Sequence, residues 1–154
     1  MTESEWQNSD KPWPMLTFLL DRTGIPTFRR FALECCRRVL HLIADDQQRE
    51  RIRDLERLAT DEIEDHPIIA SAQRSAEQAA TWAAYALAAS NAADADSFAR
   101  AAIHAAVVFG PFEAEHDPIA TLNKMQFDGR KVEAEWAAQA DILRRIVNPF
   151  PRNK

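Results

Sequence analysis

Apolar residues recur every three to four positions along most of this chain, which is the spacing of one face of an α-helix. Residues 26–46 show this pattern best, with an apolar side made of Phe28, Phe31, Ala32, Cys35, Val39, Leu42 and Ile43. The opposite side carries Arg30, Glu34, Arg37, Arg38 and His41. A helix with such a wide apolar stripe buries it against other elements. We therefore predict that the core is organised around this Arg-rich helix.

Two alanine-rich segments predict a helical hairpin. Residues 68–89 and residues 92–109 each place a row of alanines on one side at helical spacing. Small side chains in such a row allow two helices to approach closely. Ser90 and Asn91 separate the two segments, and a connection this short favours an antiparallel pair.

Shorter helices are predicted before the Arg-rich helix. Thr2 or Ser4 can cap the first one, because each hydroxyl can accept a hydrogen bond from a backbone N–H of the first turn. A second spans residues 15–20, and Gly24 suits the left-handed conformation that often follows a helix end. Thr27 is then the predicted N-cap of the Arg-rich helix.

The remaining helical pattern falls in two segments. Residues 47–59 have apolar residues on one side of a helix and residues of both charges on the other. Apolar residues also recur at helical spacing throughout residues 117–147. Gly129 destabilises the middle of the second segment by about 1 kcal/mol relative to alanine. The pattern predicts either one long helix kinked at Gly129 or two helices divided at Asp128 and Gly129.

The composition favours a single all-α domain. Of the 154 residues, 46% are apolar and 28% are charged, and only 3 are glycines, which argues against a β fold with many turns. A chain of this length can bury a substantial core without metals or disulfides. We predict a bundle of about five to seven helices over residues 1–147, with a loose tail over residues 148–154.

Both the absence of a long apolar run and the start of the chain point to the cytoplasm. No stretch is long and apolar enough for a membrane span. The first residues are acidic and polar, whereas a secretory signal is basic and then apolar. We expect a cytoplasmic protein without membrane contacts.

Charge is segregated along the chain, although the net charge is −5. Residues 22–57 contain 9 arginines against 6 acids, and residues 58–128 contain 11 acids against 3 bases. An acidic total disfavours nucleic-acid binding, so a contact along residues 29–53 is the weakest of the functional hypotheses. The basic segment fits an acidic protein surface better.

The two cysteines are adjacent, which disfavours a bridge between them because a disulfide needs more separation. Cys35 lies in the centre of the apolar stripe and Cys36 at its edge, so core packing is the expected role. The residues that could ligate zinc are Cys35, Cys36, His41, His66, His104 and His116. Their spacing matches no zinc motif, since Cys36 and His41 point to different sides of a helix. We predict no metal and no cofactor.

Little in the sequence indicates catalysis. A hydrolytic site needs a nucleophile beside a base and an orienting acid, and no such set stands out. His104 lies in an apolar helical context, and the acids of residues 61–65 form a charge run typical of a solvated loop. Three glycines cannot build a phosphate-binding loop. Non-catalytic function is therefore the main prediction.

Four blocks of the sequence resemble a family of small, functionally uncharacterised helical proteins of planctomycetes. They are MTESEW at the start, the CCRR block within residues 28–61, TWAAYALAA in the middle, and ADILRRIVNPF near the end. The sequence departs from that family at Leu40, where the family has Trp, and at Val147, where it has Gly. The resemblance implies a small bacterial helical protein and brings no catalytic residues with it.

The functional prediction rests on the arginines of residues 26–46. We predict that Arg29, Arg30, Arg37 and Arg38, here called the Arg face, bind an acidic protein partner, because Arg binds carboxylates at two points. The alternative is internal pairing, with Glu34 bonded to Arg30 and Arg38 at a spacing of four. Phe150 in the NPF segment is a second candidate contact, either as an aromatic hook for the partner or as a residue packed on the core.

A second hypothesis is an enzyme or small-ligand binder. Its predicted pocket lies near Cys35, Cys36 and His41, where thiol and imidazole groups would be available for chemistry.

Overall fold

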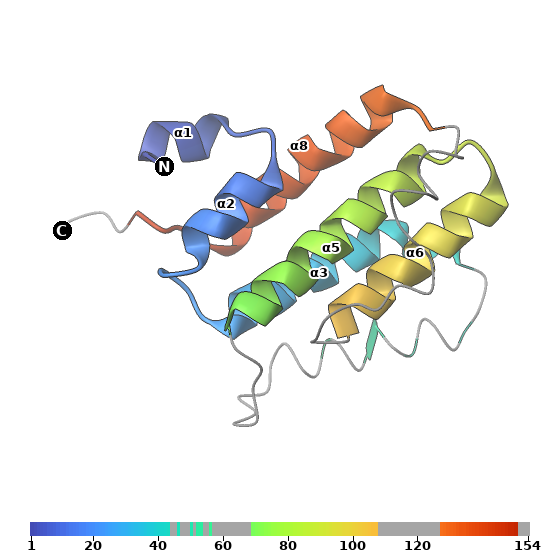
Figure 1. Ribbon diagram of the computed structural model, residues 1–154, viewed down its shortest axis with the longest axis horizontal. Helices are drawn as coiled ribbons and strands as arrows, with labels where there is room; N and C mark the ends of the chain where they lie inside the picture. The colour runs from blue at the N-terminus through green and yellow to red at the C-terminus, as the bar shows by residue number, and fades with distance from the viewer. Residues whose placement is uncertain are drawn as a thin grey trace.

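The computed structural model describes residues 1–43, 69–107 and 127–150, with residues 46, 50, 52, 53 and 56 singly. This part of the chain is all-α, as predicted, and contains no strand (Figure 1). Its elements are the α-helices α1 (Glu3–Asn8), α2 (Pro12–Leu19), α3 (Ile25–Val39), α5 (Ile69–Ala88), α6 (Ala92–Val107) and α8 (Gly129–Ile146), and the 3₁₀-helix η1 (Leu40–Leu42). The helix predicted over residues 47–59 falls largely outside the described residues.

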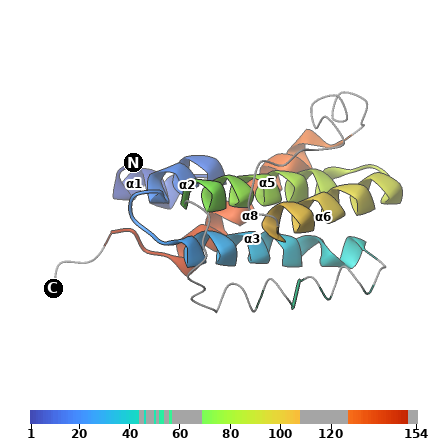
Figure 2. The same ribbon diagram turned by 60° about the horizontal axis from the view of Figure 1, so that its bottom comes forward.

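Helix α5 is the centre of the bundle, since it packs against α2, α3, α6 and α8. Its most extensive contact is with α6, which runs back along it and forms the predicted antiparallel hairpin (Figure 1). Figure 2 shows α3 beneath this hairpin, in contact with both of its helices. The Arg-rich helix is therefore one wall of the core, and α5 is its middle.

Alanine makes this close packing possible. Ala76, Ala79 and Ala83 of α5 and Ala99 and Ala102 of α6 have no solvent exposure. Because such side chains add little width, the two helices can lie close together over their full length. The apolar stripe of α3 covers the hairpin from below with larger side chains: Phe28, Phe31, Cys35 and Val39, all fully buried.

The start of α3 differs from the prediction. Gly24 is the N-cap residue with φ −95° and ψ 173°, and Ile25 and Pro26 form the first turn. Proline suits this position because its missing N–H needs no partner there and its φ is already helical. Thr27 therefore lies inside the helix, so both the Thr27 cap and the left-handed Gly24 were wrong. The Thr2 cap of α1 is confirmed as a capping box with Glu5.

Helix α8 begins at Gly129, where the sequence left open either a kink in one long helix or a division into two helices. Asp128 has an extended backbone and its carboxylate accepts a hydrogen bond of 3.0 Å from the Arg130 N–H, so it is the N-cap. Phe127 forms an isolated bridge with Ala89 at the tip of the hairpin. Helix α8 therefore starts at Gly129, and the predicted helical segment before Phe127 falls on residues 117–126, which lie outside the described residues.

The two ends of the described chain meet. The Phe150 ring, for which the sequence offered a contact with a partner or packing on the core, stacks on Phe18 with 5.5 Å between centroids and lies edge-on to Trp6, so it packs on the core. Arg144 of α8 donates hydrogen bonds of 2.9 Å to the carbonyls of Trp6 and Ser9, which closes the end of α1. Within the helices described, none is long and apolar enough to cross a membrane.

Candidate functional site

The members of the Arg face have different environments. Arg29 is buried with 5% exposure, and burial lowers the pKa of its guanidinium. Arg30 is exposed. Arg37 bonds to Glu34 and to Glu56, both at 2.6 Å. The predicted spacing of four was wrong for Glu34, which pairs with Arg37 three positions away.

Arg38 crosses to another helix. Its guanidinium binds both carboxylate oxygens of Glu135 in α8, at 2.6 and 2.8 Å. Glu135 is only 4% exposed, so Arg38 neutralises a buried charge, and this hydrogen bond raises the pKa of Arg38. Arg37 and Arg38 are therefore engaged inside the molecule, which matches the internal-pairing alternative.

The thiols lie in the core. Cys35 and Cys36 have no solvent exposure, and the Cys36 thiol donates to the Ala102 carbonyl of α6 at 3.5 Å. Burial raises the pKa of Cys36 to about 12 and that of Cys35 well above its ordinary value. His41 is exposed beyond the end of α3. The two thiols are thus buried, while the imidazole is exposed, and the predicted pocket near these three residues stays a prediction.

Of the remaining candidate histidines and acids, only His104 lies within the described residues. His104 is exposed on α6. His66, His116 and the acids of residues 61–65 lie outside these ranges. Among the residues that can be described, no three His, Cys, Asp or Glu side chains are grouped so that they could hold a metal ion.

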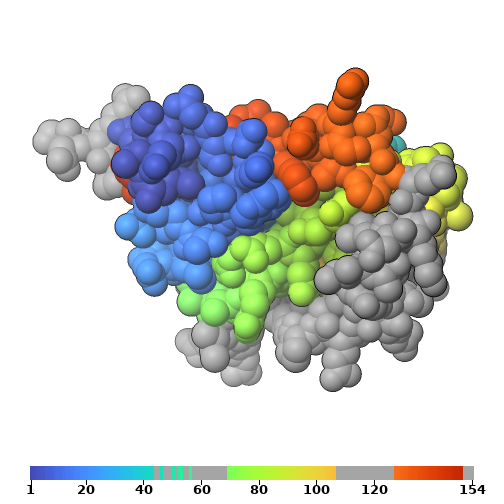
Figure 3. Space-filling model, turned by 45° about the horizontal axis from the view of Figure 1, so that its top comes forward, coloured from blue at the N-terminus to red at the C-terminus, as the bar shows by residue number. Residues whose placement is uncertain are grey.

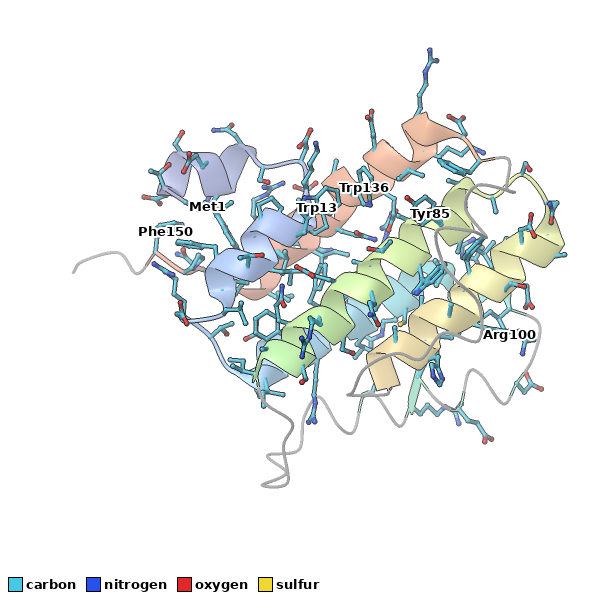
Figure 4. The ribbon with its side chains drawn as sticks, viewed as in Figure 1. Met1, Trp13, Tyr85, Arg100, Trp136 and Phe150 are labelled. Atoms are coloured by element: carbon cyan, nitrogen blue, oxygen red, sulfur yellow. The ribbon has the colours of Figure 1, made fainter. Side chains whose placement is uncertain are left out.

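A cleft of about 170 Å³ lies where α2, α5 and α8 meet, on the face shown in Figure 3. Its lining residues come from all three helices: Pro12, Trp13 and Leu16 of α2, Glu77, Ala80 and Thr81 of α5, and Trp136 and Gln139 of α8. We call it the tryptophan cleft. Figure 4 shows Trp13 and Trp136 side by side, with centroids 4.6 Å apart and planes at 88°. Cavities of about 150 Å³ can hold a benzene-sized molecule, so this volume suits a small ligand.

Two buried polar atoms at the tryptophan cleft lack hydrogen-bond partners within the described part of the protein. The Gln139 side chain has no exposure and donates from Nε2 to the Ala80 carbonyl at 2.8 Å, while its Oε1 accepts nothing. The Trp136 Nε1 donor is buried and also unpaired. A buried unsatisfied polar atom costs on the order of 1–3 kcal/mol. Both atoms thus belong to residues that line the cleft.

Glu77 provides a charge at the same place. Its carboxylate accepts a hydrogen bond from Gln73, one helical turn earlier. Desolvation raises the pKa of Glu77, against the lowering effect of the Gln73 bond. Neither a lysine nor an arginine of the described segments forms an ion pair with this carboxylate. The charge is thus only partly compensated.

Local sequence explains how the tryptophan cleft forms. Pro12 begins α2, and its fixed φ orders the turn that carries Trp13. Trp136 and Gln139 are three positions apart in α8, so their side chains share one face. Ala80 leaves space between them. The sequence analysis did not single out these residues, and the available signal was a Trp between two prolines on a short helix.

Comparison of the chain with protein-family models, with curated proteins and with solved structures finds no match. The resemblance to the planctomycete family therefore stays a prediction.

Proposed function

We propose that this protein is a non-catalytic helical domain that binds a small ligand in the tryptophan cleft. The observation that carries the proposal is the pair of buried atoms, Gln139 Oε1 and Trp136 Nε1, which have no partners in the described structure. Burying the two atoms without hydrogen-bond partners costs on the order of 2–6 kcal/mol in the free energy of folding. A bound molecule with one acceptor and one donor would recover that energy as binding energy.

The surroundings of these atoms also suit a ligand. Small-molecule sites combine aromatic and apolar walls with a few convergent polar groups. The tryptophan cleft has this composition, because two indole rings and Leu16 form its walls and its polar groups come from Glu77, Gln139 and Trp136. Its walls belong to three packed helices, so the site is largely preformed.

The lining residues favour binding over catalysis. Glu77 is the only acid or base among them, and the Thr81 hydroxyl donates to the Glu77 backbone carbonyl at 2.8 Å. The Thr81 proton is thus engaged by a backbone carbonyl and not by a base. The lining residues do not combine a nucleophile, a base and an orienting acid, so this arrangement suits holding and orienting a molecule.

Binding of an acidic protein partner through the Arg face stays a prediction of the sequence. Arg37 and Arg38 already neutralise Glu34, Glu56 and Glu135. A partner would have to compete with these ion pairs. For this reason we prefer ligand binding in the tryptophan cleft to partner binding through the Arg face.

The proposal can be tested by NMR, because the chain has 4 tryptophans and each gives its own indole N–H signal. The protein is screened against small alcohols, amides, carboxylates and ammonium ions, and the signals are assigned with Trp→Phe variants. We expect at least one compound class to shift the Trp13 and Trp136 signals in a saturable way. Trp82, which stacks on Phe98 away from the cleft, is the internal control.

The matched variant is Gln139→Leu, which keeps the side-chain size and removes both polar atoms of the amide. It should abolish or strongly weaken the shifts seen with the wild-type protein. If no compound of any class moves the two cleft signals, the cleft holds water only and the proposed function is wrong.

A further inference from the structure

The charge at the tryptophan cleft limits what its ligand can be. Glu77 is the only ionisable group among the lining residues, so the site carries a negative charge and no positive one. Lys11 is exposed and does not line the cleft, and its amine lies 6.0 Å from the Trp13 ring centroid. An anionic ligand would meet repulsion from Glu77 with no arginine or lysine lining the cleft to offset it. The chemistry therefore selects a neutral or a cationic molecule.

The walls favour the cation. Indole is the best aromatic surface for a positive charge, because the face of the ring carries the negative part of its quadrupole. Trp13 and Trp136 stand at 88° to each other, so their faces point in different directions around the cleft. Aromatic side chains are the groups that recognise alkylated ammonium ions in other proteins.

The two unpaired atoms indicate that the ligand also carries a hydroxyl group. Trp136 Nε1 needs an acceptor and Gln139 Oε1 needs a donor, and both lie on the same face of α8. A hydroxyl can accept one hydrogen bond and donate another. A hydroxyl group therefore matches the chemistry of the two atoms, and the cationic end of the ligand would then lie toward Glu77 of α5.

We propose that the tryptophan cleft binds a small alkylammonium ion that carries a hydroxyl group. Glu77 and the two indole rings would hold the cation, and Trp136 and Gln139 would hold the hydroxyl. This inference rests on the proposed function, since it names the ligand class of the same cleft. The volume of about 170 Å³ admits a molecule of the size of choline.

Choline is the probe, and its uncharged carbon isostere dimethylbutanol is the matched ligand. The two have the same shape and the same hydroxyl, and only the charge differs. Both are titrated into the full chain while the indole signals are followed and the heat of binding is measured. We expect choline to bind about tenfold more tightly than dimethylbutanol, as a cation–aromatic contact with a nearby carboxylate would give.

Two variants distinguish the effect of the Glu77 charge on choline binding from the effect of the net charge of the protein. Glu77→Gln keeps the side-chain shape and should reduce choline binding to the level of dimethylbutanol. Glu133→Gln removes an exposed charge from α8 and should leave choline binding unchanged. Tetramethylammonium, which lacks the hydroxyl, should bind more weakly than choline in the wild type and equally well in wild type and Gln139→Leu.

The outcomes distinguish the two proposals. Equal binding of choline and dimethylbutanol by the wild type, or equal loss in both glutamate variants, overturns the cation inference and leaves a ligand cleft. The same holds if a neutral or anionic compound of the wider screen binds and choline does not. If nothing binds, both the ligand class and the proposed function are wrong.

Discussion

The Arg face of α3 and the tryptophan cleft treat polar groups in opposite ways. The Arg face is rich in charge, yet Arg37 and Arg38 have carboxylate partners within the molecule. The tryptophan cleft has one charge and mostly apolar walls, yet two of its buried polar atoms have no partner in the described structure. Arg37 and Arg38, which stand out in the sequence, thus have their charges paired, whereas the two cleft atoms do not have hydrogen-bond partners in the described structure.

This difference shows which feature carries functional information. A charged side chain that already bonds to its own protein gains little from a new partner, because one favourable contact replaces another. A buried donor or acceptor without a partner gains the full value of a new hydrogen bond. Unsatisfied polar atoms in a cleft are therefore a better guide to binding than the density of charge.

The largest expected effect concerns the ion pair between Arg38 and Glu135. Arg38→Leu leaves the buried Glu135 carboxylate without its ion pair, and we expect a loss of about 2–3 kcal/mol in the free energy of unfolding. The value lies at the low end for buried pairs because the Arg38 side chain is 41% exposed and water can reach the site. Urea unfolding followed by circular dichroism measures it.

The control is Arg30→Leu, an exposed arginine of the same helix, which should change stability by less than about 0.5 kcal/mol. The double variant Arg38→Leu, Glu135→Gln should recover part of the loss, because the unpaired charge is gone. Equal effects of the two arginine variants would show that the Arg38–Glu135 pair contributes nothing to folding.

A smaller effect of opposite sign is expected at the tryptophan cleft. Gln139→Leu removes an unsatisfied buried oxygen, at the cost of one hydrogen bond to the Ala80 carbonyl, and should raise the free energy of unfolding by about 1 kcal/mol. Gln73→Leu, the matched change at a buried glutamine that is bonded to Glu77, should lower it by about 1 kcal/mol. The same urea experiment measures both.

A variant that is more stable and no longer binds ligand would identify Gln139 as a residue kept for function at the expense of stability. If Gln139→Leu destabilises the protein as much as Gln73→Leu does, the Gln139 amide is a structural group and the comparison between the two regions fails.

The smallest effect concerns the pH dependence of stability. Desolvation raises the pKa of Glu77 above its ordinary value of 4.5, so the ionised form is disfavoured in the folded state. Stability is then lost as the pH rises through 4.5 toward the folded-state pKa, and the penalty is complete above it. Below 4.5 Glu77 is protonated in both states and contributes nothing.

Glu77→Gln removes this penalty, and its amide can still bond to Gln73. We expect the variant to melt at a higher temperature than the wild type at neutral pH, with a difference that disappears in acid. Melting curves over a pH series provide the measurement. A difference that is constant with pH would mean that the charge of Glu77 costs nothing in the fold.

Much of the secondary structure followed from local patterns. The apolar spacing predicted residues 68–89 for α5, which spans Ile69–Ala88, and the Asp-Gly pair predicted either a kink or a break at the point where α8 begins. Such features depend on neighbours a few positions away, which the sequence contains directly. The start of α3 was wrong because Thr27 competed with Gly24 and Pro26, and the local preferences of the three were similar in strength.

The sequence alone determined that the chain is helical, that α3 has an apolar side, and that α5 and α6 form a hairpin, because helical periodicity and short connections act locally. Only the tertiary structure decided that Arg38 bonds to a glutamate 97 positions away. It also decided that Trp13, Glu77 and Gln139 share one cleft. The Arg38–Glu135 pair joins α3 to α8, and the cleft is formed by α2, α5 and α8. The angles at which the helices cross place these residues together, so no local pattern could reveal them.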